Sequence, residues 1–267
     1  MNDPGSIHRL AHRLTAVGEE ALDEIVAEEV AVALVYNGVS HAVMMATPCD
    51  LEDLGLGFSL TEGIVDKPSE VYDIEVEPAG RGFEVQLNIA SQRMMRLQER
   101  RRTLAGRTGC GLCGVDSLEA ALSPVRVLSD RAVIARRAIE QAMAALPAEQ
   151  RINHVNHATH AAGWATIDGR LLAVREDVGR HNALDKLGGA MVRIQREANA
   201  PGFVVVTSRC SYEMVHKAAA LGAMAIAAVS APTSLAIETA EQAGIVLAAF
   251  VREGRLTVYA NPERIVS

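Results

Sequence analysis

Residues 202–251 read GFVVVTSRCSYEMVHKAAALGAMAIAAVSAPTSLAIETAEQAGIVLAAFV, and the alternation in this stretch decides the fold. Three short apolar strands (GFVVVTS, AMAIAAVS and IVLAAFV) are separated by two alanine-rich helical stretches, residues 213–221 and 235–243. Upstream, HAAGWATI and RLLAVRE are two more strands, and residues 136–146 and 184–197 are two more helical stretches. Strands that alternate with helices of this length predict βαβ units and a partly parallel sheet that is covered on both sides.

Polar residues follow four of these strands, at positions 175–177, 207–210, 230–233 and 252–255. Because ligands of such sheets bind beyond the carboxyl ends of the strands, we expect these residues to share one pocket. A single turn of this kind would be explained by helix capping, for example by Ser211 with Glu213. Several such turns on one edge of a sheet indicate a binding site.

The densest polar segment is REDVGRHNALDK, residues 175–186, which runs from a strand end into a helix. Gly179 allows a tight turn, and Arg180, His181 and Asn182 offer donors at the helix N-terminus, where phosphate is favoured. The segment therefore predicts an anion or nucleotide pocket. The alternative is a capping and salt-bridge network around the turn, since charged residues are seldom buried without partners.

The first hundred residues have a different pattern. Residues 29–46 (EVAVALVYNGVSHAVMMA) predict a β-hairpin that turns at Asn37-Gly38. A helix is expected from Asp50 until Gly63, and a second hairpin is expected around Gly80. We therefore predict a small α+β domain with two β-hairpins over 1–104, a mobile cysteine loop over 105–124 and an α/β domain over 125–267.

Composition excludes several classes of function. The 26 Lys+Arg against 33 Asp+Glu give a net charge of −7, and aromatic residues make up only 3%. Both values argue against a nucleic-acid-binding protein. The N-terminus lacks the features of a secretory signal, so we expect a cytoplasmic protein. The most apolar run, residues 218–229, is too short to span a bilayer, and no membrane partner is expected.

Cys110 and Cys113 form the CxxC of RTGCGLCG, next to an arginine-rich run. Residues 93–114 bury no clear face, so we expect a mobile loop there. Two interpretations of its arginines stay open, a solvated helix face and a role in binding an anion. Nearby positive charge favours a nucleophilic thiolate, which could carry a persulfide. Structural zinc would need two further ligands at suitable spacing, and Cys49 and Cys210 are isolated from each other. The remaining interpretation is that both cysteines are unreactive thiols in a loop.

His154, His157 and His160 recur at every third position, which raises the question of a metal site. On a strand, His157 and His160 would face opposite ways, and no nearby carboxylate completes a set of ligands. The H-x-E and P-C-x-x-C pattern of the zinc deaminases is also absent from the sequence. We therefore predict no metal bound by protein ligands.

Taken together, RTGCGLCG, REDVGRHNALDK, SRCSYEMVHKA, SAPTSLAIE and FVREGR resemble the motifs of the formate dehydrogenase accessory sulfurtransferases, the FdhD/NarQ family. The matching segments cover most of the chain after Arg107, in order, and the upstream SLTEGIV fits as well. The resemblance implies that the later half has a cytidine deaminase-like fold without its zinc motif. It also implies a sulfurtransferase that accepts sulfur from a cysteine desulfurase as a cysteine persulfide. The sulfur then passes to the bis-molybdopterin guanine dinucleotide cofactor, the cargo delivered to the formate dehydrogenase catalytic subunit.

By the motif match, Cys110 is the expected persulfide carrier and Cys113 its neighbour, although the sequence leaves the role of Cys113 open. The match also implies a cofactor-binding segment made of Phe250, Val251, Arg252, Glu253, Gly254 and Arg255. Our own interpretation of the sheet edge adds a guanine-nucleotide pocket, which GDP or GTP would occupy in place of the cofactor. Its residues are Arg180, His181, Asn182, Ser208, Arg209 and Ser230.

Two other classes of function stay open at this point. The chain could bind and protect the molybdenum cofactor without transferring sulfur, or it could be a zinc hydrolase on a deaminase-like scaffold. A homodimer is expected from the resemblance and from the Ala- and Gly-rich helices, which permit close packing.

Overall fold

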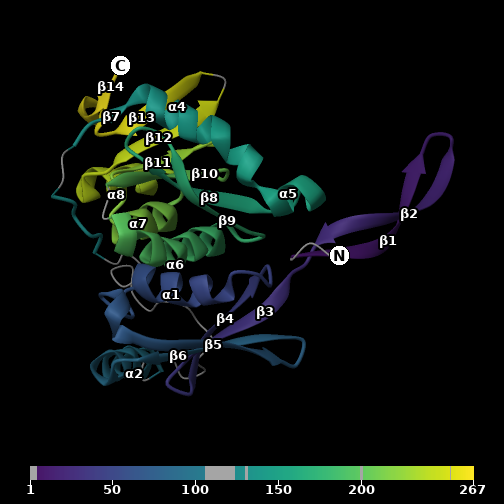
Figure 1. Cartoon of the computed structure of the whole chain (residues 1–267), viewed down its shortest axis with the longest axis horizontal. Helices are drawn as coiled ribbons and strands as arrows, with labels where there is room; N and C mark the ends of the chain where they lie inside the picture. The colour runs from purple at the N-terminus through teal and green to yellow at the C-terminus, as the bar shows by residue number, and fades with distance from the viewer. Residues whose placement is uncertain (1–4, 106–123, 130–131, 199–200, 253) are drawn as a thin grey trace.

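The computed structural model describes residues 5–105, 124–129, 132–198, 201–252 and 254–267. These residues form a mixed α/β protein with a six-stranded sheet, a four-stranded sheet and two two-stranded sheets. Figure 1 shows the six-stranded central sheet with its helices on one side of helix α1, the four-stranded sheet on the other, and a long hairpin that projects from the body. Residues 106–123 lie outside the described residues. They include Cys110 and Cys113 and nearly all of the predicted cysteine loop.

The four-stranded sheet contains both hairpins predicted from the sequence. Asn37 and Gly38 have φ values of 47° and 78°, the positive values that a two-residue turn of this kind needs. Strands β3 and β6 pair in parallel, so that the order of the sheet is β4-β3-β6-β5. The predicted helix, α1, packs on this sheet through Leu51 and Leu54. The bounds are β3 (Val30–Tyr36), β4 (Val39–Ala46), α1 (Leu51–Thr61), η1 (Pro68–Glu70), β5 (Val71–Ala79) and β6 (Gly82–Ile89).

Helix α2 (Ser91–Ala105) occupies the first part of the segment for which a loop was predicted. The prediction of a loop over residues 93–114 is therefore wrong as far as Ala105. Met94 and Leu97, three residues apart, are buried in the core of the four-stranded sheet. Arg93 is also buried, and it pairs with Asp66 and Glu70. The helix was missed because only two apolar residues, among many arginines, mark its buried face.

The central sheet has the order β13-β12-β11-β10-β8-β9. Strands β10, β11 and β12 are parallel, which confirms the partly parallel sheet that the sequence predicts. Strand β8 is antiparallel both to β10 and to β9, so β9 runs in the same direction as β10. The carboxyl ends of β9, β10, β11 and β12 therefore lie at one edge. The bounds are β8 (His160–Thr166), β9 (Leu171–Asp177), β10 (Gly202–Val206), β11 (Ala225–Ala228), β12 (Val246–Arg252) and β13 (Arg255–Ala260).

Helices cover both faces of the central sheet, as predicted. Along β10, Val204 and Val206 face the core beneath α6, α7 and α8, while Phe203 and Val205 face the core beneath α4. This double burial explains why the strands are continuously apolar. None of the helices in the described ranges has the length and apolar composition needed to cross a membrane. The bounds are α4 (Arg136–Ala145), α6 (Arg180–Ala198), α7 (Tyr212–Ala220) and α8 (Ser234–Ala243), with the smaller elements η2 (Leu146–Glu149), α5 (Arg151–Asn156), β7 (Ile134–Ala135), η3 (Pro262–Arg264) and β14 (Ile265–Val266).

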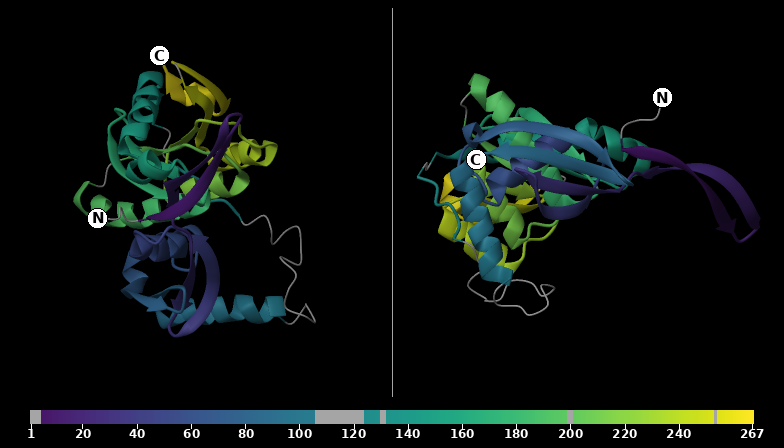
Figure 2. Two further views of the ribbon diagram at one scale, coloured as in Figure 1. Left: turned by 90° about the vertical axis from the view of Figure 1, so that its right-hand side faces the viewer. Right: turned by 90° about the horizontal axis from the view of Figure 1, so that it is seen from below.

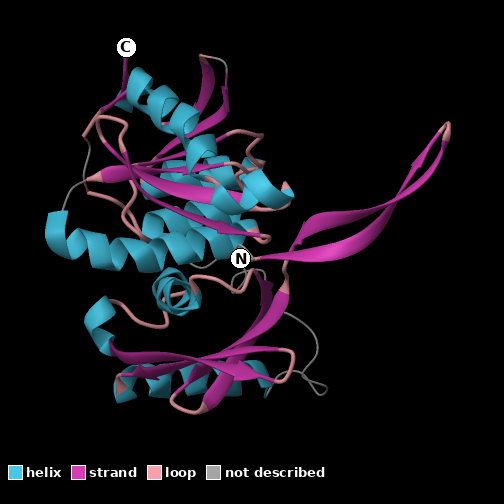
Figure 3. Ribbon diagram, turned by 45° about the vertical axis from the view of Figure 1, so that its right-hand side comes forward, coloured by secondary structure: helices cyan, strands magenta, loops and turns pink. Residues whose placement is uncertain are grey.

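A third hairpin, β1 (Ser6–Thr15) with β2 (Gly18–Ala27), was not predicted from the sequence. Its strands pair antiparallel over their whole length. Figures 1, 2 and 3 agree that it projects away from both sheets. The sequence signal is weak because neither face of the hairpin packs on a core, so that charged and apolar residues do not separate cleanly between its faces.

Helices α1 and α6 join the two halves of the molecule at backbone contact. A Cβ atom on Gly57 would lie 1.7 Å from the carbonyl oxygen of Asp185, and one on Gly189 would lie 2.2 Å from that of Asp53. Neither position has room for a side chain, because backbone atoms cannot rotate away as a flexible side chain does. The two glycines therefore set how closely the helices approach.

We predict that Gly57→Ala lowers the free energy of unfolding by about 3 kcal/mol, at the upper end of the usual cost of overpacking. The added methyl group forces α1 away from α6. Urea unfolding followed by circular dichroism measures the change, with Glu52→Ala on the exposed side of α1 as the control. An unchanged midpoint for Gly57→Ala would contradict the close contact.

Candidate functional site

The carboxyl edge of the central sheet gathers most of the residues predicted to bind a ligand. Arg180 and His181 follow β9, Ser208 and Arg209 follow β10, and Ser230 follows β11. Phe250, Val251 and Arg252 end β12, and Arg255 begins β13. Four strand spacings separate β9 from β12, which corresponds to about 19 Å. The candidate site is thus a long edge with two ends rather than one compact pocket.

At the first end, the start of α6 is firmly held. The Gly179 N–H donates to the Asp177 carboxylate (2.8 Å), and the Asn182 amide donates both to Asp177 (3.1 Å) and to the Met45 carbonyl (2.8 Å). Asn182 is therefore occupied in positioning the turn. Arg180 and His181, which precede Asn182 in the first turn, lie at the edge.

Two nitrogen atoms of this turn are buried without a hydrogen-bond partner among the described residues, Arg180 Nε and His181 Nε2. His181 Nε2 lies 3.9 Å from a Glu213 carboxylate oxygen, too far for a hydrogen bond. Glu213 itself accepts a hydrogen bond from the Ser211 hydroxyl (2.7 Å), so Ser211 does not cap α7 through its side chain. Buried polar atoms without partners are rare and indicate a missing ligand, ion or water.

Burial lowers the pKa of His181, and the neighbouring positive charge of Arg180 lowers it further. The pKa of His160, at the start of β8 on the same edge, is lowered by the same two causes. Both shifts favour the neutral imidazole at pH 7, so that Arg180 carries the positive charge at this end of the edge.

At the second end, Phe250 adopts a positive φ of 53°, a strained conformation for an aromatic residue. Its N–H lies 3.4 Å from the Ser230 carbonyl, its side chain is exposed, and the following Val251 is buried. Arg252 and Arg255 are paired across the turn, which Gly254 makes with a φ of 69°. Glu253, the other predicted residue of this segment, lies outside the described residues.

Ser208 and Arg209, between the two ends, differ from each other. The Ser208 hydroxyl is nearly buried and donates to the Arg209 carbonyl (2.9 Å), whereas the Arg209 side chain is exposed. After β11, Thr233 caps α8 by accepting from the Ala236 N–H (3.3 Å). Helix capping thus accounts for some of the polar residues in these turns. It does not account for the exposed side chains of Arg209 and Phe250.

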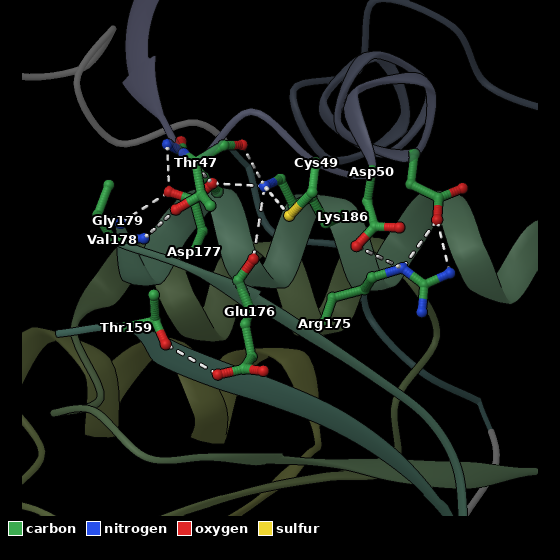
Figure 4. Close-up of polar contacts among 12 residues, drawn as sticks. Thr47, Cys49, Asp50, Thr159, Arg175, Glu176, Asp177, Val178, Gly179 and Lys186 are labelled. Carbon is green, nitrogen blue, oxygen red and sulfur yellow. Dashed lines mark hydrogen bonds and ion pairs between the residues drawn. The ribbon is translucent and has the colours of Figure 1, made fainter. Parts of the chain in front are cut away.

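The charged residues of REDVGRHNALDK outside the first turn of α6 form an internal network instead of lining the edge. Lys186 and Asp177 make a fully buried ion pair at 2.7 Å, and Lys186 also donates to the Thr47 carbonyl (2.9 Å). Arg175 binds the buried Asp53 of α1 at 2.8 Å. Figure 4 shows how these contacts tie the end of β9 and helix α6 to the loop before α1. These residues therefore form the salt-bridge network that the sequence offered as the alternative to an anion pocket.

Glu176 has a separate role in the same network. Its carboxylate accepts from the Ile152 and Asn153 N–H groups at the start of α5 (2.9 and 2.8 Å) and from the Thr159 hydroxyl (2.8 Å). His154 lies in α5, His157 follows its last residue, and His160 begins β8, so these histidines do not lie on one strand. The described ranges contain no group of three or more His, Cys, Asp or Glu residues placed to hold a metal.

A second buried pair links α6 to α7. Lys217 contacts Asp185 at 2.9 Å and Glu62 at 2.6 Å, and the Thr61 hydroxyl donates to Asp185 at 2.5 Å. Burial raises the pKa of Asp185, although Lys217 and Thr61 oppose that shift. Burial lowers the pKa of Lys217, but the nearby carboxylates of Asp185 and Glu62 raise it by more, so that Lys217 stays charged.

The two described cysteines are poor nucleophiles. Burial raises the pKa of Cys49 to about 11, against the effect of Lys186 at 3.9 Å. Burial raises the pKa of Cys210 to about 12 in the core beneath α7. Both are thiols at neutral pH, and only a thiolate attacks sulfur. The CxxC pair outside the described residues is therefore the better candidate for sulfur chemistry.

A further hollow lies away from the residues predicted to bind the nucleotide. A cavity of about 600 Å³ runs along the free side of β9, between Arg151 and Ile152 of α5 and the loop at Cys49 and Asp50. Sequence reasoning missed it because its walls come from both halves of the chain. Arg175 and Glu176, the two predicted polar positions in its lining, are engaged in the network described above.

Comparison with known proteins then decides the family. The profile of the FdhD/NarQ family matches residues 27–266, nearly the whole chain. The chain belongs to the FdhD/NarQ family. This confirms the resemblance drawn from the motifs.

Members of this family include close relatives of the chain. It is 58% identical over 241 residues to the sulfur carrier protein FdhD of Cupriavidus necator, which covers 90% of this chain and 83% of that protein. It is 50% identical over 249 residues to the FdhD of Bordetella petrii, covering 93% and 89%. A crystal structure from Desulfotalea psychrophila, assigned as a formate dehydrogenase accessory protein, matches with a TM-score of 0.76 and 27% identity, covering 98% of this chain and all of that one.

We predict that Lys217→Met destabilises the protein by about 3–5 kcal/mol, because it leaves the Asp185 carboxylate buried without its cation. Urea unfolding measures the loss, and Lys67→Met, at an exposed lysine, is the matched control. The double variant Lys217→Met/Asp185→Asn should recover part of the loss, since it removes the uncompensated charge. Equal losses for the Lys217 and Lys67 variants would rule out a stabilising role for the pair.

Proposed function

We propose that this chain is a sulfur carrier for formate dehydrogenase. It takes sulfur from a cysteine desulfurase as a persulfide on Cys110 and passes it to the bis-molybdopterin guanine dinucleotide cofactor held at the carboxyl edge of the central sheet. Membership of the FdhD/NarQ family and the sulfur carrier names of its relatives support the role. The cofactor is cargo on its way to the formate dehydrogenase catalytic subunit.

The receiving step is a thiol exchange. The Cys110 thiolate attacks the terminal sulfur of the donor's persulfide, a new S–S bond forms on Cys110, and the donor's cysteine leaves as a thiolate. No external oxidant is needed, because the sulfur moves between two thiols at the same oxidation level. The raised pKa values of Cys49 and Cys210 support the choice of the CxxC pair for this step.

The observation that carries the cofactor assignment is the pair of unpartnered buried nitrogens, Arg180 Nε and His181 Nε2, in the first turn of α6. A pyrophosphate at this place would accept hydrogen bonds from both side chains and would lie at the positive end of a 19-residue helix. The residues present fit the phosphates of a guanine nucleotide. Asn182 and Asp177 keep the turn in place for it.

The second end of the edge suits the other nucleotide of an elongated cofactor. The exposed Phe250 ring offers a stacking surface for a guanine, and Arg252 supplies positive charge beside it. Ser230 holds the Phe250 backbone, and Arg209 lies exposed between the two ends. A cofactor with a nucleotide at each extremity matches a site with two ends about 19 Å apart, four strand spacings.

A non-catalytic protein that only binds and protects the cofactor would use the same edge. The two functions differ solely in whether Cys110 carries sulfur, so an experiment on Cys110 separates them.

We predict that incubation with a cysteine desulfurase and free cysteine adds one sulfur atom to the protein, mapped by peptide mass spectrometry to Cys110. Cys110→Ala should abolish the gain, because the other cysteines that the structure describes are protonated. Cys49→Ala, as the matched control, should gain sulfur like the wild type. No gain in the wild type with an active desulfurase would leave the protective role instead, and a full gain in Cys110→Ala would assign the sulfur to another cysteine, such as Cys113.

We predict that Arg180→Gln weakens GDP binding about tenfold or more, since a charge-assisted hydrogen bond contributes about 1.5–3 kcal/mol. Isothermal titration calorimetry measures the affinity. Arg170→Ala serves as the control, because Arg170 precedes β9 at the opposite edge of the sheet. Equal affinities for the wild type and Arg180→Gln would show that the phosphates do not bind at the start of α6.

A further inference from the structure

Strand β9 is the last strand of the central sheet, and no strand in the described part of the chain pairs with its outer side. The cavity of about 600 Å³ runs along this side, and six consecutive residues of β9, from Leu171 to Glu176, line it. An edge strand carries backbone N–H and C=O groups that can pair with another chain. The backbone groups that face the cavity therefore decide what it can bind.

The pairing of β8 shows which backbone groups of β9 face outwards. The Thr207 N–H donates to the Ala161 carbonyl (3.1 Å), and the Ala161 N–H donates to the Thr207 hydroxyl (2.9 Å), so both backbone groups of Ala161 face β10. In the antiparallel pair of β8 and β9, Ala161 is opposite Glu176, and Gly163 is opposite Val174. Hydrogen-bonded and non-hydrogen-bonded pairs alternate along such a ladder. The N–H and C=O groups of Val174 and Glu176 therefore point away from β8.

Of these outward groups, the two carbonyls have partners and the two N–H groups have none among the described residues. The Val174 carbonyl accepts from the Arg175 guanidinium (2.9 Å), and the Glu176 carbonyl accepts from Lys186 (3.4 Å, Figure 4). No hydrogen bond of the described residues uses the N–H of Val174 or Glu176 outside the sheet. These two donors are two residues apart, about 7 Å along the strand. Alternate carbonyls of an extended peptide have the same spacing, so they can accept from both.

The cavity is a slot with one wall on each face of the sheet. Arg175 and Glu176 are consecutive, so their side chains leave β9 on opposite faces. Arg175 reaches Asp53 of α1, and Glu176 accepts from the Ile152 N–H of α5. Ile152 thus belongs to one wall, and Asp50, in the loop before α1, belongs to the other. A slot that continues the plane of a sheet between two walls has the shape that one more strand needs.

The wall at α1 is acidic. A smaller hollow of about 320 Å³ continues the slot past Asp50 to Glu52, and both of these side chains are exposed. Arg175 lies 3.6 Å from Asp50, but it binds the buried Asp53 at 2.8 Å, so it compensates Asp50 only in part. A basic side chain on the molecule that occupies the slot would complete the pairing.

The wall at α5 is different, because Glu149 and Arg151 carry opposite charges and Ile152 offers an apolar contact. We propose that the free edge of β9 binds an extended segment of a partner polypeptide as an additional strand. Apolar residues of that segment face Ile152 and alternate with a basic residue that faces Asp50. Hydrogen bonds to the outward N–H groups of β9 give affinity, and the alternate side chains give specificity. The site lies along the side of the sheet, so it does not depend on the cofactor assignment at the carboxyl edge.

A labelled peptide tests the proposal on the full chain by fluorescence anisotropy. The peptide has blocked ends and about eight residues, in which valine alternates with lysine and threonine, and it is long enough to span the slot. Two further versions carry N-methyl groups on alternate amides, one on each set. The unmodified peptide should bind saturably, one methylated version should bind at least tenfold more weakly, and the other should bind like the unmodified peptide. The absence of saturable binding, or an equal loss with both versions, overturns the proposal.

Variants of the protein test the same contacts from the other side. Val174→Pro removes one outward N–H, a change that an edge strand tolerates, and should weaken peptide binding about fivefold. Asp50→Asn should weaken it about threefold, since it removes the charge opposite the lysine. Glu77→Gln, at an exposed carboxylate of β5, is the matched control for Asp50→Asn and should bind like the wild type.

Circular dichroism checks that each variant is folded, and the methylated peptides test the hydrogen bonds without any change in the protein. Wild-type affinity in folded Val174→Pro, or equal losses in Asp50→Asn and Glu77→Gln, would also overturn the proposal.

Discussion

The close packing of α1 on α6 is the contact on which the rest of the molecule depends. Gly57 and Gly189 bring the two backbones together, and buried ion pairs clamp the junction at both ends, Lys186 with Asp177 and Lys217 with Asp185. Charges without partners are very costly in a dry interior, so only one register of the helices satisfies all of them. The four-stranded sheet and the central sheet are therefore held in one fixed relation, and β9 and α6 stand at the centre of it.

That junction also prepares the candidate site. Asp177 binds Lys186 on one side and the start of α6 on the other, through Gly179 and Asn182. The first turn of α6 is thereby anchored by groups that already have partners, while Arg180 and His181 keep buried nitrogens without them. Rigid support for a few polar groups with no internal partner is what a binding site for an anionic ligand needs, because ordering the site at the moment of binding would weaken it.

The sequence predicted the elements whose signals are local. Turn chemistry at Asn37-Gly38 places the first hairpin, and continuous apolar strands between alanine-rich helices place the doubly covered sheet. Helix α2 and the hairpin of β1 and β2 were missed for the same reason. The buried face of α2 is reduced to Met94 and Leu97, and the hairpin buries neither face, so in both cases the periodicity from which elements are recognised is faint.

By itself the sequence determined the family, the strand and helix pattern of the later half, and the set of polar residues at the carboxyl edge, because each depends on neighbours in the chain. Only the tertiary structure decided which residues of REDVGRHNALDK have internal partners and which lie at the edge of the sheet. Arg175, Asp177 and Lys186 turn inward to partners more than a hundred residues away or across a helix, while Arg180 and His181 stay at the edge. The physical reason is that a buried charge is placed by the groups that compensate it. Arg175 pairs with Asp53, and the Lys186–Asp177 pair is completed by hydrogen bonds to Thr47, and both Asp53 and Thr47 come from the other half of the chain.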